Sequence, residues 1–132
     1  MVMQKSNLKV LIYVESRYRI DRKRVRNSLA NLLDQQGIHS PVEVSVAIVG
    51  DRKMKELSKK YKGEDRTRNI LSFSLNEGEK MATPTGVLRL GDIVVSYPIA
   101  RLEASRDEML VDDKIEELIL HGMTHLLGTH HE

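Results

Sequence analysis

The chain has 132 residues, of which 30% are charged and 40% hydrophobic, and its formal net charge is +2. These values are ordinary for a globular protein and predict one domain over residues 1–132. Cysteine is absent from the sequence, which excludes disulfides and cysteine-ligated zinc. No apolar run is long enough for a signal peptide or a membrane span, so we expect a cytoplasmic protein with no membrane partner.

The charges are segregated along the chain. Basic residues gather in segments 15–26 and 51–68, whereas acidic residues gather in segment 103–117. This separation fits a polyanion that meets the basic side of the protein. The charges alone leave a second reading open, in which these segments are simply solvated helix faces.

The first half of the chain predicts alternating strands and helices. Residues 8–14 are apolar and rich in β-branched side chains, which indicates a buried strand. A helix with Asp21 as N-cap is expected to run to Gln36. Valines alternate with polar residues at the start of segment 42–49, as in a half-exposed strand. Asp51 is expected to cap a short helix after it.

The second half supplies two more strands. The polar, basic segment 62–68 is expected to be a loop, and residues 70–75 and 88–96 are strand candidates. Glycine and proline between these two segments predict an irregular connection. A further helix is expected after the N-cap candidate Ser96, with Leu102 and a neighbouring isoleucine on its apolar side.

The last helix is expected to begin near Asp112 or Asp113, whose charge suits a helix N-terminus. Its predicted core side consists of Ile115, Ile119, Leu126 and Leu127. The fold class predicted from all these elements is mixed α/β (α+β): a small four-stranded mixed sheet packed with helices. A metzincin-like three-histidine metal site is expected at the C-terminal helix.

Three histidines at the end of the chain have the spacing of metal ligands. His121 and His125 are four residues apart, so on a helix they project from nearly the same side. Gly128 is expected to end the helix and allow a turn that brings His131 back as third ligand. Three imidazoles and one open position describe a catalytic zinc site. His130 as the third ligand, or an accidental histidine-rich tail, remain alternatives.

The offsets of these histidines match the metzincin protease motif, except at Gly122. A metalloprotease carries its general-base glutamate at this position, and glycine has no side chain to accept a proton from metal-bound water. Peptidase activity is therefore not expected, whereas another metal-centred hydrolysis remains open. A packing role is expected for Gly122, because it lets a helix approach a strand closely.

The C-terminal segment resembles the H-G-x-x-H-L-x-G-Y-D-H signature of the YbeY family, which consists of bacterial zinc-dependent endoribonucleases also called rRNA maturation factors. Segment 69–73 is similar to the family's T-D/N-V-L-S-F, and segment 90–96 to its L-G-D-I-x-I-S. Lys62 follows a tyrosine where the family has Y-R. The similarity runs from about residue 57 to the end of the chain.

The resemblance implies a metal-dependent endoribonuclease in ribosomal RNA maturation and ribosome quality control. It implies one Zn²⁺ ion held by His121, His125 and His131, although imidazoles also accept other transition metals. Lys62 is the implied catalytic residue, which neutralises the scissile phosphate, and Arg66 and Arg68 are expected to hold the RNA backbone. The expected partners are ribosomal RNA and the ribosome or its proteins, not DNA. Three positions depart from the family pattern: Lys62 replaces an arginine, Thr129 a tyrosine and His130 an aspartate.

Two other functions remain open from the sequence. One is a non-catalytic RNA- or ribosome-binding assembly factor that is stabilised by its metal. The other is a hydrolase of peptides or small amides, for which Glu117, one turn before His121, is the candidate base. Ser72, Asn69 and Asp92 are expected to be structural.

Overall fold

A computed structural model describes residues 7–74 and 86–131, with side chains described as far as Gly128. Its elements in chain order are β1 (Leu8–Val14), α1 (Arg22–Gln35), β2 (Val42–Val49), α2 (Asp51–Lys62), β3 (Ile70–Ser74), β4 (Leu88–Ser96), α3 (Tyr97–Arg106) and α4 (Val111–His131). The predicted fold class is confirmed, because these elements form one mixed four-stranded sheet packed with helices.

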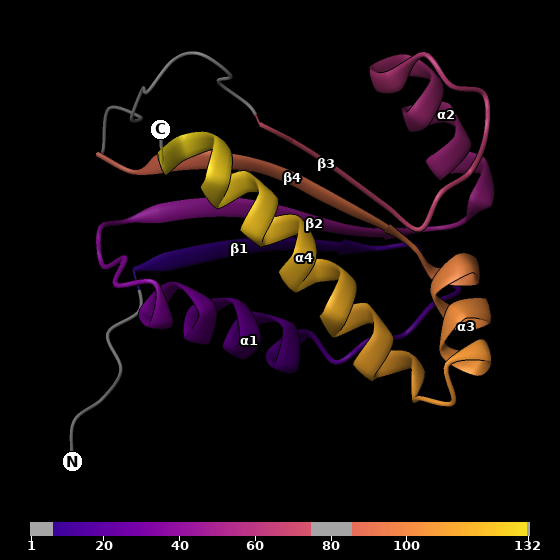
Figure 1. The fold of residues 1–132 in the computed structure, drawn as a ribbon, viewed down its shortest axis with the longest axis horizontal. Helices are drawn as coiled ribbons and strands as arrows, with labels where there is room; N and C mark the ends of the chain where they lie inside the picture. The colour runs from indigo at the N-terminus through magenta and orange to yellow at the C-terminus, as the bar shows by residue number, and fades with distance from the viewer. Residues whose placement is uncertain (1–6, 75–85, 132) are drawn as a thin grey trace.

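The sheet has the strand order β1-β2-β4-β3 (Figure 1). β1, β2 and β4 are parallel, and β3 runs antiparallel to β4 at the edge. Side chains alternate between the two faces. Ile93 of β4 belongs to the core under α1 and α4, whereas the next residue, Val94, packs with Met54 of α2. Helices therefore cover both faces, and α4 crosses the face that carries the larger core.

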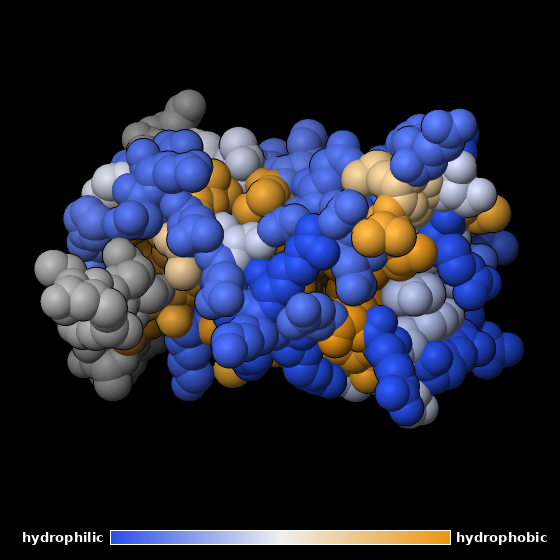
Figure 2. Space-filling model, turned by 90° about the horizontal axis from the view of Figure 1, so that it is seen from below, coloured by the Kyte–Doolittle hydropathy of each residue, from blue (hydrophilic) through white to orange (hydrophobic). Residues whose placement is uncertain are grey.

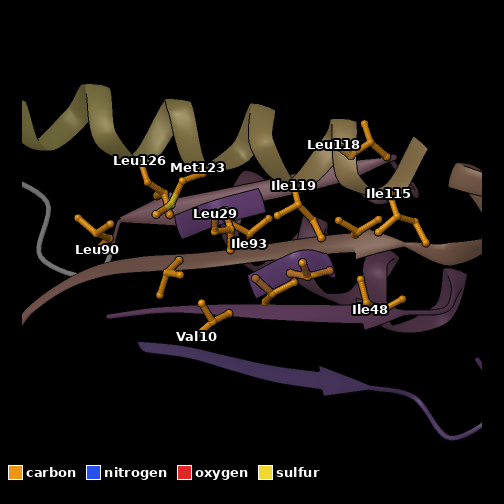
Figure 3. Packing of buried hydrophobic residues seen from close by; sticks show 14 of the residues in the cluster. Val10, Leu29, Ile48, Leu90, Ile93, Ile115, Leu118, Ile119, Met123 and Leu126 are labelled. Carbon is orange, nitrogen blue, oxygen red and sulfur yellow. The ribbon is translucent and has the colours of Figure 1, made fainter. Parts of the chain in front are cut away.

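The inner side of α4 anchors it to the sheet. Figure 3 shows apolar side chains of α4 directed toward the strands, among them Ile115, Ile119, Met123 and Leu126. Each such buried side chain contributes roughly 1.5–3 kcal/mol of hydrophobic stabilisation. The predicted core side of the helix is confirmed. Although α4 has 21 residues, no helix in the described ranges is long and apolar enough to cross a membrane.

Strand β1 is an edge strand, and the prediction of a buried strand was wrong. Val10 is its one buried residue, while Leu11 is 45% and Tyr13 60% exposed. Its apolar composition cannot reveal this position, because the strand order depends on how the later strands pair.

Two helix predictions also need correction. Gly50, not Asp51, is the N-cap of α2, and the Asp51 carboxylate instead accepts hydrogen bonds from the hydroxyls of Thr67 and Ser96, both at 3.3 Å. Leu102 is 66% exposed, since α3 packs through the small residues Ala100 and Ala104. The caps predicted at Asp21 and Ser96 are confirmed by hydrogen bonds to Arg24 N and Ile99 N.

The basic and acidic segments of the sequence partly neutralise each other across the interface of α1 and α4. The guanidinium of Arg24 contacts Asp113 at 2.5 Å and Glu116 at 2.7 Å, and the Ser28 hydroxyl also donates to Glu116. These hydrogen bonds, that of Arg24 first, hold the pKa of Glu116 below its usual value. Part of the basic segment is therefore unavailable to a polyanion.

This contact predicts a pH-dependent contribution to stability. Because the folded pKa of Glu116 is depressed, its stabilisation is present above the unfolded value of about 4.3 and is lost as the pH falls through the folded pKa. Arg24→Gln should lower the melting temperature at pH 7, and the difference from the parent chain should shrink at pH 3. Thermal unfolding of both proteins at both pH values measures this difference in melting temperature. A difference that does not change with pH would contradict the linkage.

Candidate functional site

The exposed side of α4 and the edge strand β3 form one small depression of about 200 Å³. It is lined by Lys62, Arg68, Ile70, Leu71, Ser72, His121 and His125. Because the opposite side of α4 is buried, both histidines project away from the core toward this hollow. The structure thus brings two predicted metal ligands together with Lys62, which lies about sixty positions earlier in the chain.

Ser72 orients one of the two imidazoles. Alternate residues of β3 face opposite sides: Ile70 packs toward α4, whereas Leu71 packs with α2. Ser72 is therefore on the α4 side, and its Oγ lies 3.0 Å from Nδ1 of His125. With a proton on Nδ1 that donates to this hydroxyl, the lone pair of Nε2 is left for an ion. Ser72 thus gains a role that the sequence did not reveal.

The contact predicts that Ser72→Ala weakens zinc binding about 10–100-fold, the usual cost of removing a partner that orients a metal-binding histidine. Ser72→Thr keeps a hydroxyl at this position and should restore most of the affinity. Titration of zinc against a competing chelator measures both variants. Equal affinities for alanine, threonine and the parent would show that Ser72 does not orient the imidazole.

Gly122 has the packing role expected for it. A Cβ at this position would lie 3.0 Å from Ile70 Cδ1 and 3.0 Å from Ile93 Cγ2. The residue therefore faces the sheet, at a closely packed contact with β3 and β4. A glutamate at position 122 would point into the core, which explains in physical terms why this helix carries no base there.

Lys62 contributes a positive charge to the depression. It ends α2, where Gly63 takes the left-handed C-cap conformation with φ of 69°, so the expected loop begins after it. Arg66 and Arg68, expected to hold RNA, both pair with the carboxylate of Glu64. Within ranges 7–74 and 86–131, Lys62 makes no ion pair. None of the described carboxylates therefore competes with a phosphate for its ammonium.

The end of α4 differs from the prediction. The helix continues through Gly128 to His131, so the expected turn at Gly128 was wrong. Glycine tolerates a turn but does not require one. On a continuous helix, position 131 lies about 15 Å along the axis from position 121. The side chains of His130 and His131 lie outside the described residues, among which no group of three potential ligands occurs. His131 as third ligand stays a prediction.

The chain matches the sequence profile of a family described as Endoribonuclease YbeY over residues 12–132. The chain belongs to the YbeY family. An Endoribonuclease YbeY from Syntrophus aciditrophicus is 35% identical over 89% of this chain and 72% of its own length. One from Persephonella marina is 32% identical over 86% of this chain and 71% of its own.

A solved structure has a similar fold. The solution structure of a Thermotoga maritima protein has a TM-score of 0.60 and 26% identity, and the match covers 93% of this chain and 75% of the other. The YbeY resemblance, visible in motifs only from about residue 57, extends in the family match back to residue 12 and so includes the end of β1 and all of α1.

The remaining candidates of this YbeY chain have structural partners. Glu117, the base considered for a peptide or amide hydrolase, pairs at 3.2 Å with the buried ammonium of Lys114. The amide of Asn69 donates to the carboxylate of Glu103, which ties β3 to α3. Asp92 accepts a hydrogen bond from the hydroxyl of Ser45 on the neighbouring strand. The structural roles expected for Asn69 and Asp92 are confirmed.

Proposed function

We propose that this chain is a zinc-dependent endoribonuclease that acts in ribosomal RNA maturation and ribosome quality control. Membership in the YbeY family, whose relatives carry the name endoribonuclease, supports RNA cleavage. The observation that carries the proposal is the depression that brings His121 and His125 together with Lys62, which makes no ion pair with the residues that the structure describes. Metal ligands beside a free cation suit hydrolysis of a phosphodiester.

The residues present fit a zinc ion. His121 and His125 supply two imidazoles, and the proposed third ligand is His131, whose side chain lies outside the described residues. A bound zinc would supply Lewis acidity and an activated water. Ser72 holds the ring of His125, and one tautomer leaves Nε2 for the ion.

Lys62 binds the phosphate in this proposal. Its ammonium offsets the charge of the scissile group as a point charge, without the two-pronged contact that an arginine makes. The proposed partners are ribosomal RNA and the ribosome or its proteins, in the cytoplasm, with RNA rather than DNA as substrate.

Lys62→Ala is expected to leave zinc binding unchanged and to lower kcat/KM for RNA cleavage about 10–100-fold, since a hydrogen bond to a charged group contributes roughly 1.5–3 kcal/mol. Lys55→Ala removes the same charge from an exposed position of α2 outside the depression and serves as control. Steady-state cleavage of a structured ribosomal RNA fragment measures both. Equal rates for the two variants would remove Lys62 from the site.

A second function keeps some support. The described residues assemble two ligands, and α4 continues past Gly128. This arrangement favours a non-catalytic ribosome assembly factor in which metal stabilises the fold. Zinc would then raise the melting temperature, while highly purified protein would show no metal-dependent cleavage. A peptide or amide hydrolase has less support, since Gly122 faces the sheet and Glu117 is ion-paired.

A further inference from the structure

The outer edge of β1 directs backbone groups away from the sheet. At the two ends of this strand, the Asn7 carbonyl accepts from Val42 N and the Glu15 amide donates to Ile48 O, so odd-numbered residues face β2. Since backbone groups alternate in direction along a strand, the N–H and C=O groups of Val10 and Ile12 point away from β2, toward the open edge. Within the described ranges, β1 pairs with β2 alone, and Figure 1 shows it at the end of the sheet beside α1.

Two arginines of α1 reach over to this edge. Nη1 of Arg22 donates to Ile12 O at 3.1 Å, and Nη2 of Arg26 donates to Val10 O at 3.3 Å. Four residues of a helix span about 6 Å and two residues of a strand about 6.6 Å, so the two spacings match. The arginines thus occupy the carbonyls that a further strand would use, which protects an edge from unselective pairing.

A groove lies between this edge and α1. It encloses about 400 Å³ and is lined by Leu8, Lys9, Val10, Arg26, Asn27 and Ala30. Its apolar floor has cationic side chains at the rim. On the other face of the strand, Leu11 and Tyr13 are exposed. Figure 2, which views the molecule from the side where α1 lies in Figure 1, shows hydrophobic patches set among mostly hydrophilic residues.

We propose that the outer edge of β1 is a docking site for an extended segment of a partner protein in which carboxylates alternate with apolar side chains. The carboxylates of the partner form charge-assisted hydrogen bonds with the guanidiniums of Arg22 and Arg26, which then no longer donate to the carbonyls of β1. The released carbonyls of Val10 and Ile12 then accept hydrogen bonds from the backbone of the incoming strand.

Carboxylate and apolar side chains alternate in the proposed partner segment because successive residues of a strand point to opposite faces. Side chains on the α1 face meet the arginines and the groove, whereas those on the opposite face lie beside Leu11 and Tyr13. A nucleic acid fits less well: its phosphates could pair with the arginines, but its backbone has no row of N–H donors for the released carbonyls of Val10 and Ile12. The charge and the backbone pattern together select an acidic peptide strand.

The test uses the full chain and a capped peptide in which glutamate alternates with valine. Binding should slow hydrogen exchange of the Val10 and Ile12 amides, observed by NMR. The Arg22→Glu/Arg26→Glu variant should bind about tenfold or more weakly, given roughly 1.5–3 kcal/mol for a hydrogen bond to a charged group. Arg19→Glu/Lys23→Glu makes the same charge change without contacts to β1 and should keep binding within about threefold.

A second probe leaves the protein unchanged. The same peptide with N-methyl groups on alternate residues keeps its charges but loses its backbone donors, and it should no longer bind. Equal binding of methylated and unmethylated peptide would overturn strand addition in favour of charge attraction. Two further outcomes would also overturn the proposal: single-stranded RNA that displaces the peptide and protects the same amides, or concentration-dependent pairing of two copies through β1 without peptide.

Discussion

His125→Ala should leave the purified protein without stoichiometric zinc and should lower RNA cleavage by more than about 100-fold. The substitution removes a proposed ligand itself, so its effect should exceed the 10–100-fold typical of residues that only orient a ligand. It also removes the imidazole that Ser72 holds at 3.0 Å. Elemental analysis of the protein and a cleavage assay on ribosomal RNA measure the two effects separately.

The chain offers a matched control in His39, an exposed histidine outside the depression. His39→Ala should keep one equivalent of zinc and the full cleavage rate. If His125→Ala also kept a full equivalent, the site at α4 would be wrong. If it lost zinc but cleaved RNA normally, cleavage would not need the metal, and the proposed zinc-dependent mechanism would be wrong.

Gly91→Ala is expected to destabilise the fold by about 2–6 kcal/mol, the sum expected for backbone strain and overpacking. Gly91 has a φ of 150°, which side chains rarely adopt. A Cβ there would overlap the carbonyl oxygen of Phe73 on β3 and lie 3.1 Å from Leu126 Cδ2 on α4. Gly91 therefore lies where β3, the edge strand of the site, and α4, the helix that carries its histidines, both approach β4 closely. Chemical denaturation measures the change.

Gly128→Ala provides the control with the opposite sign. A Cβ at position 128 meets nothing within 4 Å, and the residue lies within α4. Alanine should therefore stabilise the zinc-free chain by roughly 0.5–1 kcal/mol through its higher helix propensity. Equal free energies of unfolding for the two alanine variants would show that the fold does not require glycine at position 91, where β3 and α4 approach closely.

Local patterns predicted much of this fold. The alternation in segment 42–49 and the cap at Asp21 depend on neighbours in sequence, and both agree with the structure. Local patterns could not predict features that depend on contacts between distant segments. Whether β1 is buried depends on which strand pairs beside it, and the burial of α3 through small residues depends on how closely it approaches α4. The pairing of Arg24 with α4 likewise joins segments about ninety residues apart.

The site was predicted in parts. Helical spacing placed His121 and His125 on one side, and the structure confirms that arrangement. Lys62 entered through the resemblance to the YbeY family, and its position beside the histidines depends on tertiary structure. Ser72 was missed, because its role requires knowing which face of β3 meets α4. The alternation of β3 indicates that Ser72 shares a face with Ile70, but the sequence does not reveal that this face meets α4. At Gly128 the conformational freedom of glycine permits a turn but does not require one, and the chain remains helical.

The central claim is that one depression holds a metal and cleaves RNA. The most direct measurement is cleavage of structured ribosomal RNA by protein of known zinc content, before and after chelation and again after zinc is restored. We predict one zinc per chain, cleavage that disappears with the chelator, and recovery on adding zinc to the parent but not to His125→Ala. Cleavage that persists unchanged in zinc-free protein would contradict the account.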